Sequence, residues 1–156
     1  MDQKGQSRLD TILGVLLLVS MIGALYMAFL GAPREKTMGD LQRIFYFHVP
    51  SGITGLTAFA VNFVASVMYL IKKDRRWDNL ALSAAEIGVM FVSIVLVTGP
   101  IWAKPVWFVW WTWSPRLTSS LILWMLYVAY LLVRNYVPDL DRRAMMSAVF
   151  GIVAFV

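Results

Sequence analysis

The sequence contains no cysteine, which excludes disulfide bonds, thiolate metal sites and the Cys-x-x-Cys-His attachment motif of c-type cytochromes. Charged residues are scarce, at 15% of the 156 positions, whereas hydrophobic residues make up 60% and aromatic residues 14%. A soluble domain of this size could not bury that share of apolar side chains around one core. The composition therefore indicates a membrane protein.

Four stretches that lack both lysine and arginine have about the length needed to cross a bilayer of roughly 30 Å. They cover residues 11–30, 53–71, 81–101 and 117–133, and a fifth run occupies residues 144–156. The first is longer than the apolar core of a signal peptide, so we expect it to be retained. At about 20 Å the fifth is too short to span, which leads us to expect a truncated chain. The sequence predicts an all-α, polytopic transmembrane helical bundle forming a single membrane domain, 1–156.

Lysine and arginine are distributed unevenly between alternate connections. Segments 1–10, 72–80 and 134–143 hold nine of them, and segments 31–52 and 102–116 hold five. Under the positive-inside rule the amino terminus is cytoplasmic, and segments 31–52 and 102–116 are external. The net charge of +5 is explained by anchors beside the spans, so we predict the lipid bilayer and no nucleic acid as a partner.

His48 is the only histidine of the chain, and it stands in the segment RIFYFHVPSG, two residues before Pro50. We place Pro50 in the first turn of the second helix and His48 at the outer membrane edge. A lone histidine at an interface is usually a half-solvated structural residue. The alternative is that a neutral ring nitrogen of His48 ligates haem iron, which requires an apolar wall beside it.

Tryptophan is concentrated in the segment IWAKPVWFVWWTWSPRLTSS, within the expected external loop 102–116. The five residues are Trp102, Trp107, Trp110, Trp111 and Trp113. Interfacial tryptophan is ordinary, and a belt would account for one or two residues at each helix end. Five within twelve positions favour a flat aromatic platform for a large planar ligand such as haem.

Basic and polar residues add further candidates, each with a structural alternative. Arg116 flanks the tryptophans, and Arg43 and Lys104 are expected on the same side; all three could pair with haem propionates or simply anchor headgroups. Glu86 interrupts the third span and Asn62 the second. We favour a structural role for Glu86, because it lies near the end of its helix and no partner for it is evident.

The segments QRIFYFHVPSG at 42–52 and GPIWAKPVWFVWWTWSPRLTSSLILWMLYVAYLLVR at 99–134 resemble the CcmC family, the haem-handling C proteins of cytochrome c maturation. The resemblance covers nearly the whole chain. It implies six transmembrane helices, an external Trp-rich loop of the Trp-Trp-Asp type that holds haem, and two external histidines as axial ligands. His48 matches the first histidine, and the chain ends before the second.

One residue departs from the family pattern at the end of the Trp-rich loop. Ser114 stands where that loop usually carries aspartate, giving WWTWSPR. The loss of this carboxylate puts in doubt how the loop engages haem or an acceptor.

From the residues and the resemblance together we expect a non-enzymatic, haem-binding protein of the bacterial inner membrane. His48 would be the metal ligand, Trp102, Trp107, Trp110, Trp111 and Trp113 with Arg116 would complete the site, and b-type haem would be held non-covalently. The resemblance implies a membrane-tethered haem chaperone as acceptor and ATP-binding cassette subunits as partners. The alternatives are a structural subunit of a membrane complex that binds no haem, and a subunit that transports haem or another solute.

Overall fold

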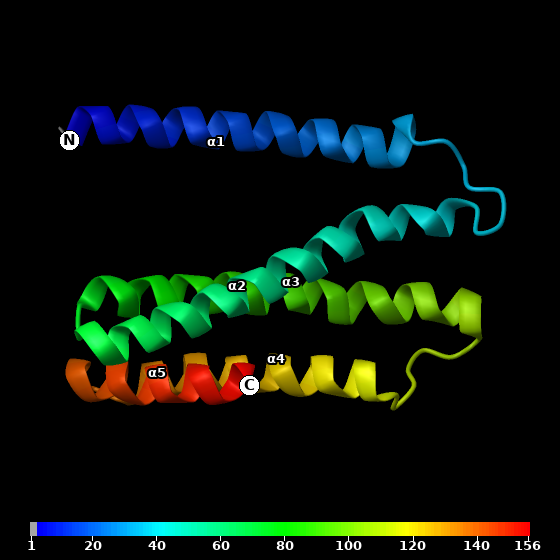
Figure 1. Ribbon diagram of the computed structural model, residues 1–156. Helices are drawn as coiled ribbons and strands as arrows, with labels where there is room; N and C mark the ends of the chain where they lie inside the picture. Colours follow the sequence, from blue (N-terminus) through cyan, green and yellow to red (C-terminus); the bar gives the residue numbers. More distant parts are fainter. Residues whose placement is uncertain (1–2) are drawn as a thin grey trace. The chain divides into compact units, whose positions relative to one another are not determined.

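A computed structural model describes the backbone of residues 3–156 and the side chains from residue 8 onward; Lys4, which entered the charge count, lies outside the described side chains. The described residues form helices and no strand. In chain order these are α1 (Gln3–Tyr26), η1 (Met27–Gly31), η2 (Asp40–Ile44), α2 (Phe45–Lys72), α3 (Arg75–Trp107), α4 (Pro115–Tyr136) and α5 (Leu140–Phe155). The predicted all-α fold is confirmed (Figure 1).

Four helical segments are long and apolar enough to cross a membrane: Arg8–Gly31, Asp40–Lys72, Arg75–Trp107 and Pro115–Tyr136. Each contains one of the four predicted spans. The second and third are longer than expected, with 33 residues each. The fifth helix, α5, begins before the predicted residue 144 and has 16 residues.

The chain divides into two compact units, Met1–Tyr46 and Phe47–Val156. In the first unit, the Arg43 guanidinium holds the end of the first span. It donates to the carbonyl oxygen of Ala28 at 2.8 Å and to that of Phe29, and it pairs with Asp40 at 3.2 Å. Arg43 thus satisfies carbonyl groups that a helix end leaves without partners.

In the second unit, the helices begin at residues that suit a helix start. Asp74 accepts a hydrogen bond from the Arg76 N–H at the start of α3, and Asp139 accepts one from the Arg142 N–H at the start of α5. Pro115 opens α4 directly after Ser114, at a position where its missing N–H costs nothing. Figure 1 shows α3, α4 and α5 running alongside one another with α2 crossing them obliquely.

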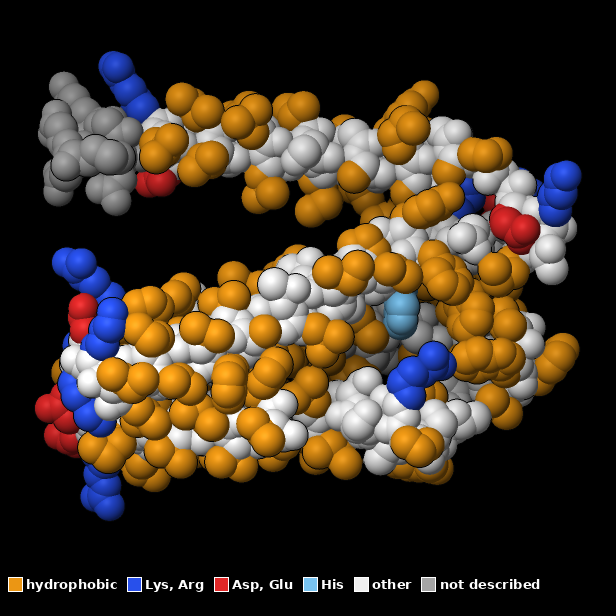
Figure 2. All heavy atoms as spheres, viewed as in Figure 1, with side chains coloured by type: hydrophobic (Ala, Val, Ile, Leu, Met, Phe, Trp, Pro, Cys, Tyr) orange, Lys and Arg blue, Asp and Glu red, His pale blue; other side chains and the backbone are white. Residues whose placement is uncertain are grey.

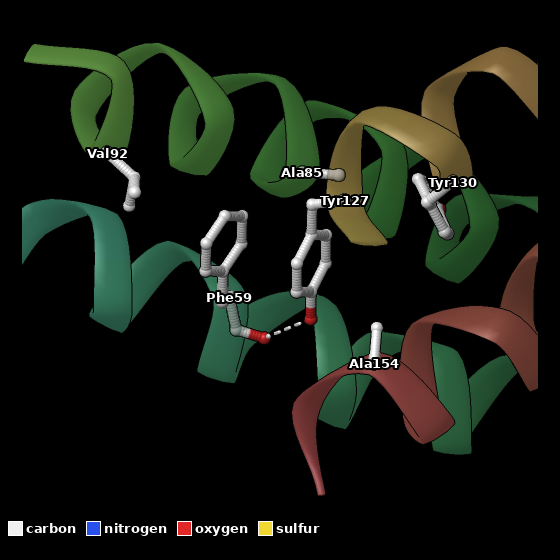
Figure 3. Packing of buried hydrophobic residues seen from close by; sticks show 6 residues of the cluster. All are labelled: Phe59, Ala85, Val92, Tyr127, Tyr130 and Ala154. Carbon is white, nitrogen blue, oxygen red and sulfur yellow. Dashed lines mark hydrogen bonds between the residues drawn. The ribbon is translucent and has the colours of Figure 1, made fainter. Parts of the chain in front are cut away.

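The core of the second unit joins α2, α3, α4 and α5 around two stacked rings. Phe59 and Tyr127 lie parallel, with centroids 3.7 Å apart and an interplanar angle of 8°. Ala85 and Val92 of α3 and Ala154 of α5 pack around them (Figure 3). The Tyr127 hydroxyl also donates to the Phe59 carbonyl oxygen at 3.4 Å, so this polar group is satisfied inside the bundle.

Small residues let α2 and α3 approach closely along one antiparallel seam. A Cβ added to Gly88 would lie 2.2 Å from Cε1 of Phe59, and one added to Gly55 would lie 2.7 Å from Cγ2 of Val92. One added to Gly52 would meet Val95 at 3.8 Å. Small residues at helix contacts are typical of membrane proteins, in which dispersion contacts and hydrogen bonds hold helices together.

Two buried polar contacts tie the helices together at the end of the unit that holds the α2–α3 turn. Asp78 of α3 and Arg134 of α4 form a two-pronged ion pair at 2.5 and 3.0 Å, and both side chains are almost fully buried. Asn62 of α2 donates to the Ala81 carbonyl oxygen at 2.7 Å. Arg134, which directly follows the predicted fourth span 117–133, is therefore part of the helix contacts. Glu86 is exposed on α3.

We predict that Gly88→Ala destabilises the protein. The added methyl group has to displace the ring of Phe59, which is fully buried and stacked on Tyr127. Overpacking of this kind costs about 1–3 kcal/mol of unfolding free energy. Thermal unfolding in detergent measures the effect, with Gly23→Ala as the control, because a Cβ at that position meets nothing within 4 Å. Equal unfolding temperatures for the two variants would contradict the described seam.

Candidate functional site

His48 lies in the first turns of α2, and its half-buried ring lies against α3. Its Nδ1 is 2.9 Å from the Oγ1 of Thr98. A Cβ added to Gly99 would lie 3.4 Å from the Cε1 of His48, so the glycine leaves room for the ring. Within the described part of the chain, Nε2 of His48 makes no hydrogen bond. Figure 2 shows this side chain in pale blue at the surface of its unit.

The helix α3 continues through both of its prolines, Pro100 and Pro105, beyond residue 101, where the third span was predicted to end. It runs to Trp107, so Trp102 and Trp107 are helical and the irregular connection covers only 108–114. Pro50 likewise lies inside α2 and not in its first turn. A proline costs one backbone hydrogen bond, and membrane helices tolerate this where neighbouring groups take up the freed carbonyl.

The tryptophan rings form two perpendicular pairs. Trp102 and Trp107 have centroids 4.9 Å apart and an interplanar angle of 88°, and Trp111 and Trp113 are 6.0 Å apart at 78°. Edge-to-face geometry matches the positive ring edge to the negative ring face. The prediction of one flat platform is therefore wrong in detail, because these rings present both faces and edges.

Several of these aromatic side chains are strongly exposed. The exposed fraction is 58% for Trp110 and 76% for Trp113, and it reaches 80% for Phe108. Trp102 and Trp111 are partly buried. Exposed aromatic side chains gathered in one short segment indicate contact with lipid, a ligand or a partner protein.

Two hydrogen-bond donors of the segment remain available. The indole N–H of Trp111 is buried and finds no acceptor within the described residues. The exposed guanidinium of Arg116 forms no ion pair or hydrogen bond with the described side chains. An acidic group placed among these residues would gain charge-assisted hydrogen bonds.

The other two basic candidates have partners in the protein. Lys104 donates to the Phe108 carbonyl oxygen at 3.1 Å, and its Nζ lies 6.0 Å from the centroid of the Trp110 ring. Lys104 therefore supports the turn that follows α3. Arg43 is engaged with the carbonyl groups of Ala28 and Phe29 in the first unit. Of the three basic candidates, Arg116 is the one whose side chain has no hydrogen-bond or ion-pair partner among the described residues.

Ser114 takes the N-cap position of α4, with extended backbone angles and no hydrogen bond from its side chain to the helix. Its carbonyl oxygen accepts from the Thr118 N–H at 3.0 Å. An aspartate here would face four backbone N–H groups and the positive end of the helix. Serine keeps the start of the helix but supplies no negative charge.

Two residues of this region escaped the sequence analysis. Thr98 touches His48 across 50 positions of sequence, and nothing in the sequence pairs them. Phe108 adopts a left-handed conformation, with φ of 63°, at the point where α3 ends. Phe108 stands among the tryptophans in WFVWW, so a search for all aromatic residues, and not for tryptophan alone, would have included it. A helix usually ends in glycine at such a position, because a side chain there is strained.

The candidate site contains the imidazole of His48, exposed aromatic rings and the unpaired guanidinium of Arg116. No group of three or more His, Cys, Asp or Glu residues that could hold a metal ion occurs among the described residues. A metal would therefore find a single nitrogen ligand, unless it came with its own macrocycle. The unpaired N–H of Trp111 and the guanidinium of Arg116 suit the carboxylates of such a macrocycle, so the residues present fit haem.

We predict that Phe108→Gly unfolds at a higher temperature than Phe108→Ala. Both variants lose the exposed ring, so their difference isolates the backbone, where alanine retains the left-handed strain of about 1 kcal/mol. Thermal unfolding of the two variants in detergent measures this difference. A variant Phe108→Ala as stable as Phe108→Gly would show that the conformation carries no strain.

The family model described as heme exporter protein C, CcmC, matches residues 3–156. Proteins named heme exporter protein C are similar to this chain. The one from Rhodobacter capsulatus is 31% identical over 138 residues, covering 88% of this chain and 57% of the relative. Those from Paracoccus denitrificans and Escherichia coli K12 are 33% and 38% identical, covering 80% and 78% of this chain and 52% and 51% of the relatives.

The chain spans about half the length of the curated relatives that it matches. The match nevertheless extends over nearly all of the present sequence, and the four apolar segments fit a multi-pass membrane protein. The chain belongs to the heme exporter protein C family, CcmC.

Proposed function

We propose that this chain holds haem at the external face of the membrane and passes it to a membrane-tethered haem chaperone during maturation of c-type cytochromes. The observation that carries the proposal is the position of His48. Its ring contacts α3 at Thr98, about one turn before Trp102, and its Nε2 makes no hydrogen bond among the described residues. The relatives are named heme exporter protein C, which supports haem as the ligand.

In this proposal His48 Nε2 would ligate the iron, and no bond-making step is assigned to the protein. Trp107, Trp110 and Trp113 offer exposed indole faces and edges to the macrocycle. The chain contains no cysteine, so haem is held non-covalently. Iron ligation and apolar contact together select haem over other planar molecules.

The propionates of haem are assigned to the polar groups beside the tryptophans. Arg116 can bind a carboxylate with two parallel hydrogen bonds, and the buried N–H of Trp111 can donate one more. Trp102 stands behind Trp107 as its edge-to-face partner and fixes the orientation of that ring.

We further propose that the amino terminus is cytoplasmic and that the segment 102–116 is external. The larger number of basic residues in alternate connections supports this orientation. It places the haem-binding groups on the side where c-type cytochromes acquire haem. ATP-binding cassette subunits of the maturation system are proposed as neighbours in the membrane.

The first test is the visible absorption spectrum of the detergent-purified protein from haem-replete cells. We predict a Soret band that is lost or strongly reduced in His48→Ala, because the iron then lacks its protein ligand. The double variant Trp110→Ala/Trp111→Ala is expected to retain several-fold less haem. Tyr136→Ala serves as the control, since this exposed aromatic residue lies at the far end of α4.

The outcomes separate the alternatives. A stable, correctly inserted protein without a Soret band would reject haem binding by this chain and favour a structural subunit. A Soret band unchanged in His48→Ala would move the ligand to another group. Equal losses in the double variant and in Tyr136→Ala would show that the tryptophans contribute only as membrane anchors.

Orientation is tested with single cysteines, because the native chain has none. Thr112 lies in the connection just before α4 and Asn135 lies in the last turn of α4, and both are exposed. A membrane-impermeant maleimide added to intact cells should label Thr112→Cys, and it should label Asn135→Cys only after the membrane is opened. The reverse pattern would overturn the proposed orientation.

A further inference from the structure

The hydrogen bond between His48 and Thr98 has a direction that can be deduced from a second hydrogen bond. The Thr98 hydroxyl donates to the carbonyl oxygen of Ile94, one turn earlier in α3, with an O···O distance of 2.7 Å. A threonine hydroxyl has one proton to donate and two lone pairs to accept with. With its proton committed to Ile94, Thr98 can only accept from His48, so Nδ1 of His48 carries the proton.

The same helix uses this device a second time, at a place where its direction is certain. The Ser93 hydroxyl donates to the Val89 carbonyl oxygen at 2.7 Å and accepts from the indole N–H of Trp124 at 2.8 Å. An indole N–H can only donate. In α3, therefore, a hydroxyl that donates to a carbonyl oxygen of its own helix accepts a hydrogen bond from a ring N–H of another helix. Thr98 and His48 have the same arrangement.

We propose that Thr98 is a positioning residue that fixes the Nδ1–H tautomer of His48 and thereby keeps Nε2 unprotonated and available to haem iron. The part that concerns iron rests on the proposed function. In a neutral imidazole one nitrogen carries the proton and the other carries the lone pair. Protonation of Nδ1 therefore leaves the lone pair on Nε2, the atom that makes no hydrogen bond in the described structure.

The backbone beside Thr98 limits the position of the ring. Gly99 lies so close that its missing Cβ would be 3.4 Å from the Cε1 of His48. The ring is thus held by the hydroxyl at Nδ1 and by the glycine next to Cε1. A group that accepts a hydrogen bond from the other ring N–H of a metal-binding histidine also makes the coordinating nitrogen more basic.

The sharpest test needs no haem, because His48 is the only histidine of the chain. Selective labelling of histidine with nitrogen-15 gives one pair of ring signals in the nuclear magnetic resonance spectrum of the detergent-solubilised protein. At mildly alkaline pH we predict that the native protein and Thr98→Ser show a protonated Nδ1 and an unprotonated Nε2. Thr98→Val, which has the same shape and lacks the hydroxyl, should show a mixture of both tautomers.

Matched controls exclude a general disturbance of α3. Ser93→Ala removes the other hydroxyl of the same kind, and the tautomer of His48 should remain unchanged. Circular dichroism of each variant verifies that the helices are retained. A native spectrum with the proton on Nε2, or a Thr98→Val spectrum identical to the native one, would overturn the proposal.

A second readout concerns haem itself. Loss of a hydrogen bond behind a metal ligand typically lowers metal affinity about 10-fold or more, so Thr98→Val should retain about tenfold less haem than Thr98→Ser. Equal haem retention and equal spectra for these two variants would reject the role of Thr98 in ligation. If the native protein shows the Nδ1–H tautomer and binds no haem, the proposed function fails and the tautomer assignment stands.

Discussion

The close approach of α2 and α3 is the constraint on which the site depends. From the core outward, Phe59 meets Gly88, Gly55 meets Val92, Gly52 meets Val95 and His48 meets Thr98 and Gly99. Steps of four and three residues on one helix correspond to the same steps on the other, so a single register runs from the stacked rings to the histidine. Apolar contacts deep in the bundle therefore decide which group of α3 faces the imidazole.

The sequence was sufficient to predict the helical class and the approximate spans, because long uncharged runs permit little else in a bilayer. It located the third span inside α3 but neither bound of that helix, and Pro100 and Pro105 are compatible with both a helix and a loop. Ring orientation at Trp102 and Trp107, and the choice of Arg134 as a buried partner of Asp78, depend on neighbours from other helices. Such contacts leave no periodic signal in one sequence, and Thr98 was missed for the same reason.

The candidate site combines one side chain that is fixed by its contacts with several that are exposed or unpaired. In the proposed function, this combination would suit temporary binding of haem. His48 is fixed by α3, whereas Trp110 and Trp113 stand exposed on the irregular connection and Arg116 has no partner within the described residues. A protein that hands its ligand to another has to offer one good anchor without enclosing the ligand. In the proposed function, His48 would be that anchor.

The uninterrupted course of α3 has a consequence for the membrane around it. A helix of 33 residues is about 50 Å long, whereas the hydrocarbon layer is roughly 30 Å thick, so about 20 Å of α3 has to lie in the headgroup layers or be accommodated by tilt. The turns that carry Trp102 and Trp107 then stand among lipid headgroups, where indole rings are most stable. A thicker bilayer would draw these rings toward the acyl chains, so lipid length sets how far the aromatic end of the protein stands above the hydrocarbon.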